Sequence, residues 1–226
     1  MEIIGLFTAA MKDRRRLLGI YQFISMFGIV LVLLRQFLET DKTFLFLLWN
    51  FFLAGLPLIF SSIMVQMSRN RYNRQWIIFL GLVWLVFLPN APYMLTDYIH
   101  VMYGDRGYWM LDAFTLSWFA VAAFAAAVIS LNDVSGLLLT RFNRYQVSMI
   151  VFTICLMCSF GIYLGRDLRF NSWDVIMRPK AIVSETVVRL SNPMADFATW
   201  VSAGIIGLLL FLVYQGMKLV ENHPRG

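Results

Sequence analysis

Apolar residues fill this chain in long blocks, and short polar segments separate the blocks. Six blocks are each about 20 residues long, which is the length a helix needs to cross about 30 Å of hydrocarbon. We therefore expect an all-α integral membrane protein, a bundle of about six transmembrane helices, with residues 1–226 in one polytopic membrane domain. The expected spans are residues 17–38, 44–66, 76–96, 110–131, 147–165 and 198–219.

The third block is interrupted by two prolines. The run from Trp76 to Leu88 has 13 residues, or about 20 Å of helix, which is too short to cross the membrane. The span must therefore continue through Pro89 and Pro92. Because proline cannot donate a backbone hydrogen bond and disfavours helix in the residue before it, we expect a helix broken at Pro89–Pro92. Asn90 is expected to cap the renewed helix.

Small residues and a short amphipathic segment refine this picture. The alanines clustered in residues 120–127 predict a central packing helix, because small side chains let helices approach closely. Cys155 and Cys158 lie in the middle of a block and are expected to pack as small apolar residues. Within residues 180–190, apolar residues recur at helical spacing opposite charged ones, which predicts a short interfacial amphipathic helix.

Composition and charge agree with a membrane protein. Charged residues make up 14% of the chain, against about a quarter in soluble domains. The net charge of +6 does not predict nucleic-acid binding, because Lys and Arg lie in short clusters between the blocks, where they contact lipid headgroups. Lys and Arg are more numerous on the side of the N-terminus, 11 against 8, so we expect both termini to be cytoplasmic.

Polar residues gather at the end of the third block, the start of the fourth and the end of the fifth. In this topology all three lie at one membrane face, the outer one, so we expect a polar site there. The residues concerned are Asp97, His100, Asp112, Arg166, Asp167, Arg169, Asn171 and Asp174. If the third helix continues, four residues share one stripe along it: Asn90, Tyr93, Asp97 and His100.

These residue types suit two kinds of chemistry. Asp97, His100 and Asp112 are candidate catalytic residues, with His100 as a general base oriented by Asp97. The same three residues are candidate ligands of a divalent metal such as Zn²⁺ or Mn²⁺. Arginines bind phosphate or carboxylate groups bidentately. The candidate substrate-binding residues are Asn90, Tyr93, Arg166, Arg169, Asn171, Trp173 and Asp174. In the competing interpretation, these charged residues only anchor helix ends or lock helices together.

Two motifs carry a resemblance to a known family. The first is Pro89-Asn90-Ala91-Pro92-Tyr93 with Thr96-Asp97 and His100. The second is Gly161-x-Tyr163-Leu164-Gly165-Arg166 with Arg169 and Asn171-Ser172-Trp173-Asp174. With these motifs and its span pattern, the chain resembles a bacterial membrane family catalogued as domain of unknown function 1361. The resemblance implies a multi-span protein of the bacterial cytoplasmic (inner) membrane, and no particular reaction.

Three functions fit these observations. The first is a membrane-embedded hydrolase or transferase that acts on an anionic lipid or lipid-linked substrate at the outer face. The second is a transporter or channel subunit in which the broken helix lines a path. The third is a non-catalytic assembly or partner protein. The ionisable residues lie near one face instead of the midplane, which favours the enzyme. Membrane lipids are the expected partners, while the substrate, the metal and the oligomeric state stay open.

Overall fold

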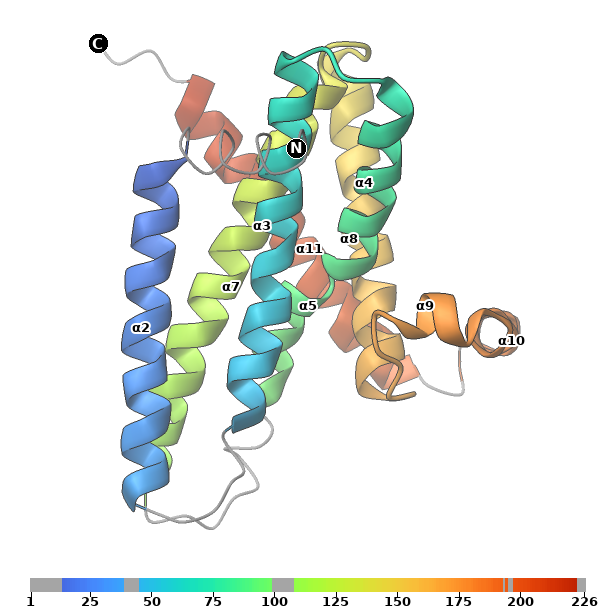
Figure 1. Ribbon diagram of the computed structural model, residues 1–226. Coiled ribbons are helices and arrows are strands. Elements are labelled where there is room, and N and C mark those ends of the chain that lie inside the picture. The colour runs from blue at the N-terminus through green and yellow to red at the C-terminus, as the bar shows by residue number, and fades with distance from the viewer. Residues whose placement is uncertain (1–13, 39–44, 99–107, 193, 195–196, 223–226) are drawn as a thin grey trace. The chain divides into compact units, whose positions relative to one another are not determined.

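The computed structural model describes residues 14–38, 45–98, 108–192, 194 and 197–222, and these form helices and turns without a strand (Figure 1). Within these residues, six helices are long and apolar enough to cross a membrane. The elements are α2 (Arg15–Leu38), α3 (Leu45–Arg69), α4 (Arg74–Phe87), α5 (Asn90–Tyr93), the 3₁₀ helix η2 (Met94–Tyr98), α7 (Trp109–Leu138), α8 (Arg144–Arg166), α9 (Asp174–Met177), α10 (Pro179–Ser191) and α11 (Phe197–Asn222). The prediction of an all-α, multi-pass membrane protein is confirmed.

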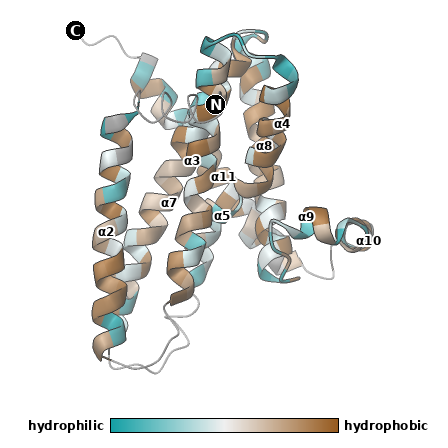
Figure 2. Cartoon of the chain, in the orientation of Figure 1, coloured by the Kyte–Doolittle hydropathy of each residue, from teal (hydrophilic) through white to brown (hydrophobic). Residues whose placement is uncertain are grey.

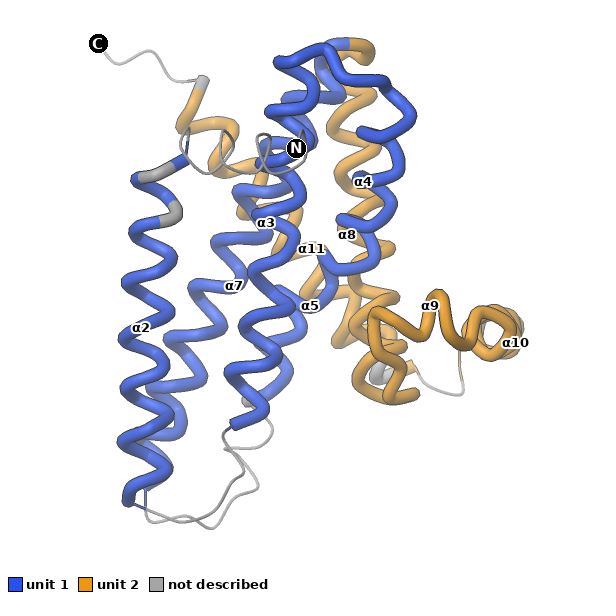
Figure 3. The backbone as a smooth tube through the Cα atoms, viewed as in Figure 1, with its two compact units in different colours: residues 1–140 blue, residues 141–226 orange. Residues whose placement is uncertain are grey.

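The chain divides into two compact units (Figure 3). Unit 1 is Met1–Thr140 and contains α2 to α7, while unit 2 is Arg141–Gly226 and contains α8 to α11. The helices are apolar along most of their length, and the turn between α3 and α4 is hydrophilic (Figure 2). The expected single membrane domain stays a prediction.

The core of unit 1 lies along α7, which packs against both α2 and α3. The alanines that face these neighbours are fully buried: Ala120, Ala123, Ala126 and Ala127. The approach of α2 is also close, because a Cβ added at Gly28 would lie 2.5 Å from the ring of Phe119. Small residues therefore set the helix spacing here, and the expectation of a central packing helix is confirmed.

The third span is broken where the prolines predict it. Helix α4 ends at Phe87, and α5 begins after a turn at Leu88 and Pro89. The expected cap at the start of the renewed helix is wrong, because α5 begins at Asn90 itself. The Asn90 side chain instead donates to the carbonyl oxygen of Phe87 at 2.9 Å. That carbonyl needs a donor because its usual partner, the amide of Ala91, donates to Leu88 at 3.2 Å.

Beyond Tyr93 the helix tightens into the 3₁₀ form of η2. A 3₁₀ helix has three residues per turn, so residues four apart no longer lie above one another. The expected α-helical stripe that joins Tyr93 to Asp97 is therefore wrong. His100, the last member of the stripe, lies outside the described residues.

Two ion pairs join α2 to α7. Arg14, immediately before α2, pairs with Asp133, and Arg35 in the last turn of α2 pairs with Asp112 in the first turn of α7. The two arginines are 21 residues apart, and so are the two aspartates. At 3.5 residues per turn, 21 residues make about six full turns, so each pair of like residues shares one helix face. The equal spacing fixes the register of these antiparallel helices.

In unit 2, α8 packs against α11. Ala203, Gly207 and Leu210 are buried on α11 at helical spacing. On α8, Cys155 and Cys158 are free thiols that are also fully buried, which confirms the expectation that they pack as small residues. The predicted amphipathic helix near residues 180–190 is α10. Its place at the membrane interface stays a prediction.

Candidate functional site

Two pairs of polar side chains lie at one end of unit 1, which we call the polar end: Arg35 with Asp112, and Asn50 with Asp97. Each of these side chains comes from a different span, and successive spans run in opposite directions. The end of α2, the start of α3, η2 and the start of α7 therefore lie at the same end (Figure 1). Asp97 and Asp112 are two of the site residues predicted from the sequence, and both lie here.

The carboxylate of Asp112 is held by Arg35 through both of its oxygens. Arg35 Nε donates to Oδ1 at 2.5 Å, and Nη2 donates to Oδ2 at 3.3 Å. Arg35 is 2% exposed and Asp112 is 1% exposed. The ring of Tyr108 lies 5.6 Å from the Arg35 guanidinium carbon, which adds a cation–π contact. Removing either partner would leave an uncompensated buried charge, so the loss of one side chain alone should destabilise unit 1.

Asp97 is the second buried carboxylate, at 3% exposure. Its Oδ2 accepts a hydrogen bond of 3.4 Å from Asn50 Nδ2. The polar Asn50 inside the second span therefore links α3 to η2. Asp97 lies in η2, shortly before residues 99–107, which include His100 and lie outside the described part of the chain. The partnership of Asp97 with His100 therefore stays a prediction.

The metal prediction depends on the same histidine. In the described part of the chain, no three His, Cys, Asp or Glu side chains lie close enough together to hold a metal ion. Asp112, one of the three expected ligands, uses both oxygens on Arg35. A metal held by Asp97, His100 and Asp112 stays a prediction.

The second motif forms a compact turn in unit 2, residues 166–178, which we call the cationic turn. Asp174 holds it together: Oδ2 accepts from the backbone amide of Asn171 at 2.7 Å, and Arg178 donates to both oxygens at 2.9 Å. Arg178 also lies over the ring of Phe170, 5.4 Å from its centroid. Arg169 takes a left-handed backbone conformation, with φ of 56°. The hydrogen bonds from Arg178 and from the Asn171 amide lower the pKa of Asp174.

Arg166 and Arg169 remain at the surface of this turn. Arg169 is exposed and Arg166 is half-buried. Among the residues that the structure describes, neither arginine forms an ion pair, and Asp174 pairs with Arg178 instead. Asn171 and Trp173 are exposed beside them. The substrate-binding roles of these residues, and those of Asn90, Tyr93 and Asp174, stay predictions.

Because the pKa of Asp174 is lowered, the stability of this turn depends on pH. A lowered folded-state pKa contributes stability above the ordinary carboxyl pKa and loses it as the pH falls through the folded value. We expect the turn to be intact at neutral pH and to open in strong acid. In Arg178→Gln the Asp174 pKa should return toward its ordinary value, so opening should begin at higher pH. A carbon NMR titration of the Asp174 carboxyl, assigned with Asp174→Asn, measures both values.

Lys180→Gln is the control for that titration. It removes an exposed positive charge two residues after Arg178, and within the described residues Lys180 makes no hydrogen bond to Asp174. The Asp174 pKa should change less in Lys180→Gln than in Arg178→Gln. Equal changes in the two variants would contradict the specific role of the Arg178 hydrogen bonds.

Three arginines that pair with buried aspartates were not predicted from the sequence: Arg14, Arg35 and Arg178. The signal for Arg178 is local, since it follows Asp174 by four residues, a separation at which side chains on a helix meet. The signal for Arg14 and Arg35 is that they are 21 residues apart at the first span, α2, just as Asp112 and Asp133 are 21 residues apart in the fourth span, α7. Neither signal depends on knowledge of the fold.

The six apolar helices, with charged side chains buried as ion pairs between them, define a multi-pass α-helical membrane protein. Residues 49–213, well over half of the chain, match the family described as "Protein of unknown function (DUF1361)". The chain belongs to this family. The match includes both the broken third span and the cationic turn. No curated protein and no solved structure matches the chain.

Proposed function

We propose that this protein binds an anionic lipid or lipid-linked substrate at the membrane surface and acts on it as a hydrolase or transferase. The proposal rests on which charged residues of the cationic turn are paired and which are not. Asp174 and Arg178 neutralise each other, whereas Arg166 and Arg169 form no ion pair within the described residues. A phosphate or carboxylate group would satisfy these guanidinium groups.

The surroundings of the two arginines favour a lipid over a water-soluble anion. The short helix α9, which forms part of the turn, exposes Ile176 and Met177, at 81% and 75%. Trp173 is 41% exposed and belongs to a residue type that is enriched at membrane interfaces. Anion-binding groups next to apolar side chains match a molecule with a charged headgroup and hydrocarbon chains.

The proposed chemistry rests on Asp97 and His100. Asp97 is buried and oriented by Asn50, so it can fix the imidazole of His100 as a general base for hydrolysis or group transfer. Asp112 supports this site by holding Arg35 in place. We further propose that the protein lies in a bacterial inner membrane, with both termini in the cytoplasm and the site at the outer face. The surplus of Lys and Arg on the side of the N-terminus supports this orientation.

Native mass spectrometry of the detergent-purified protein tests the binding step. At equal concentrations, we expect dioleoyl phosphatidylglycerol to bind more tightly than dioleoyl phosphatidylcholine. Arg166→Gln with Arg169→Gln should weaken phosphatidylglycerol binding about tenfold or more, because each lost hydrogen bond joins two charged groups. Arg141→Gln with Arg144→Gln is the matched control, since it removes two exposed arginines around the start of α8.

The outcomes separate binding from chemistry. If both double variants bind phosphatidylglycerol equally well, the cationic turn is not the headgroup site. Asp97→Asn and His100→Ala should keep the binding and lose the reaction. If these two variants restore the lipid profile of a deletion strain in full, the enzymatic part of the proposal fails while the binding part stands.

A further inference from the structure

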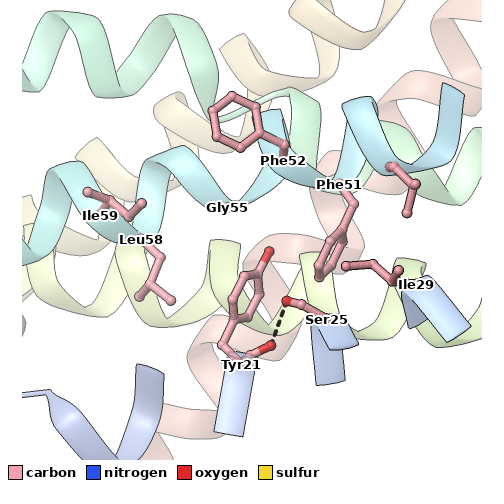
Figure 4. A pocket seen from close by; sticks show the side chains of 9 residues that line it. Tyr21, Ser25, Ile29, Phe51, Phe52, Gly55, Leu58 and Ile59 are labelled. Carbon is pink, nitrogen blue, oxygen red and sulfur yellow. Dashed lines mark hydrogen bonds between the residues drawn. The ribbon is translucent and has the colours of Figure 1, made fainter. Parts of the chain in front are cut away.

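Unit 1 has an apolar groove between α2 and α3, and its lining includes Tyr21, Phe51 and Leu58 (Figure 4). The hydroxyl of Ser25 donates to the backbone carbonyl of Tyr21 at 2.6 Å, and the Tyr21 hydroxyl is buried. The groove therefore selects no particular ligand. The apolar surface of α9 and α10 in unit 2 is more informative, because charged residues adjoin it and a membrane span lies on either side of it in the chain.

Helices α9 and α10 belong to a segment that starts and ends at one face of the membrane. The segment, residues 167–199, joins two apolar spans, Arg144–Arg166 and Trp200–Glu221. Helix α10 has 13 residues, or about 20 Å, so it is too short to cross about 30 Å of hydrocarbon. The chain must therefore leave and re-enter the bilayer at the same face, and α10 lies beside that face.

Helix α10 turns apolar side chains away from the protein. Val183 and Val187 are one helical turn apart and are 61% and 57% exposed, and we call these two side chains the valine face. On the opposite side of the helix, Glu185 and Arg189 form an ion pair of 3.7 Å and are half-buried. A surface helix in a soluble protein buries its apolar side and exposes its charged side. The reverse arrangement here is typical of a helix whose outer side contacts an apolar medium.

The residues beside the valine face suit the headgroup region of a bilayer. Lys180 is exposed and lies three residues before Val183, so the two share one side of the helix. A lysine there can lay its stem along apolar surface while its ammonium group reaches a lipid phosphate. Ile176 and Met177 of α9, which packs against α10, are also exposed. Exposed apolar side chains next to cations are the pattern by which helices lie in a membrane interface.

Arg178 joins α10 to the cationic turn. It is the last residue of the turn and directly precedes Pro179, the first residue of α10. Its side chain donates to both carboxylate oxygens of Asp174, the residue that holds the turn together. The position of α10 therefore determines where this end of the turn lies.

We infer that the valine face of α10 inserts into the hydrocarbon boundary of the membrane, so that α10 lies in the interface and holds the cationic turn at the level of the lipid headgroups. The insertion uses apolar contacts and does not depend on the charge of any headgroup. Its consequence for the turn rests on the function proposed above, because it places Arg166 and Arg169 where an anionic headgroup would reach them.

Fluorescence quenching in vesicles of dioleoyl phosphatidylcholine tests the insertion. The probe NBD is attached to one introduced cysteine, in Val183→Cys, in Val187→Cys or, as the matched control, in Val188→Cys. Val188 is 60% exposed but lies about 100° around the helix from Val187. All three positions are exposed, so the label leaves the packing intact. The native Cys155 and Cys158 are buried, and unlabelled variants of the wild type measure any background.

A doxyl group on the lipid chains should quench NBD at Val183 and Val187 about twofold or more as strongly as at Val188, and aqueous iodide should show the opposite order. Equal doxyl quenching at the three positions would overturn the proposed orientation of α10. Protection of Val183 and Val187 from both quenchers would overturn the membrane as the occupant, because it would show that a partner protein or a second copy covers the valine face.

A second measurement tests the position of the cationic turn. NBD at Asn171→Cys, an exposed position in the turn, should be quenched by a lipid that carries a nitroxide on its headgroup. Val183→Asn with Val187→Asn should reduce this quenching by about half or more. Ser184→Asn with Ser191→Asn, at two exposed serines of the same helix, should leave it unchanged.

Equal quenching in the two double variants would overturn the link between α10 and the turn. These vesicles contain no anionic lipid, so the quenching results do not depend on headgroup binding. If Arg166 and Arg169 fail to bind phosphatidylglycerol while the quenching pattern is as expected, the proposed function fails and the insertion of α10 stands.

Discussion

Asp112→Ala is expected to destabilise unit 1 by about 3–5 kcal/mol, the cost of removing one partner of a buried ion pair. The variant removes the carboxylate that pairs with Arg35, a residue that is only 2% exposed in the wild type. Denaturation of the purified protein in mixed micelles measures the free energy of unfolding. As a control, Glu185→Gln removes a pair of 3.7 Å between partly exposed side chains, which should cost at most about 1 kcal/mol.

A double variant separates stability from chemistry at this position. Replacing a whole buried ion pair by apolar residues is often neutral or stabilising, so Arg35→Met with Asp112→Leu should recover most of the stability that Asp112→Ala loses. If Asp112 only holds the helices together, the double variant should also recover function. If it is stable and inactive, Asp112 takes part in the chemistry. Stability of Asp112→Ala close to that of the wild type would contradict the buried pair itself.

The spans and the break in the third helix could be predicted because their causes are local. Length and hydropathy within one block decide whether a helix can cross a membrane. The restrictions that Pro89 and Pro92 impose act on their immediate neighbours. The alanine-rich helix α7 is central for a similar reason, since its small side chains permit close contact whichever helices become its neighbours.

The details of the broken third span could not be predicted, because they depend on which backbone groups the fold leaves without partners. Asn90 has the residue type of a helix cap, and it does cap a helix end. Its side chain donates to the carbonyl oxygen of Phe87, at the end of the preceding helix, because the amide of Ala91 donates to Leu88 instead. The change to a 3₁₀ helix after Tyr93 also removes the stripe that regular α-helical geometry predicts.

The sequence also does not predict which partner each charged residue pairs with. Spacing between spans predicts that Asp112 lies at the same end as Asp97, and the structure confirms it. Polarity alone does not say that Asp112 binds Arg35, because many arginines lie near span ends. The convergence of Asp97 with Arg166 and Arg169, which belong to different units, stays a prediction.

Gly207→Ala is expected to destabilise unit 2, because α11 lies directly against α8 at this glycine. A Cβ at Gly207 would lie 1.8 Å from Ser159 Oγ and 2.7 Å from the backbone carbonyl oxygen of Cys155. The Ser159 side chain can rotate, but the carbonyl belongs to the backbone of α8, so the helices must separate. Overpacking of this kind typically costs 1–3 kcal/mol, and a larger side chain, as in Gly207→Leu, should prevent the two helices from packing.

Gly204→Ala is the matched control, because it adds the same methyl group to the same helix with nothing within 4 Å of it. It should not be destabilised, since alanine is the better helix former. Thermal unfolding in detergent compares the two variants. Adding Ser159→Ala to Gly207→Ala should restore only part of the stability, because the Cys155 carbonyl still obstructs the methyl group. Equal melting temperatures for Gly204→Ala and Gly207→Ala would mean that α8 and α11 lie further apart than the structure shows.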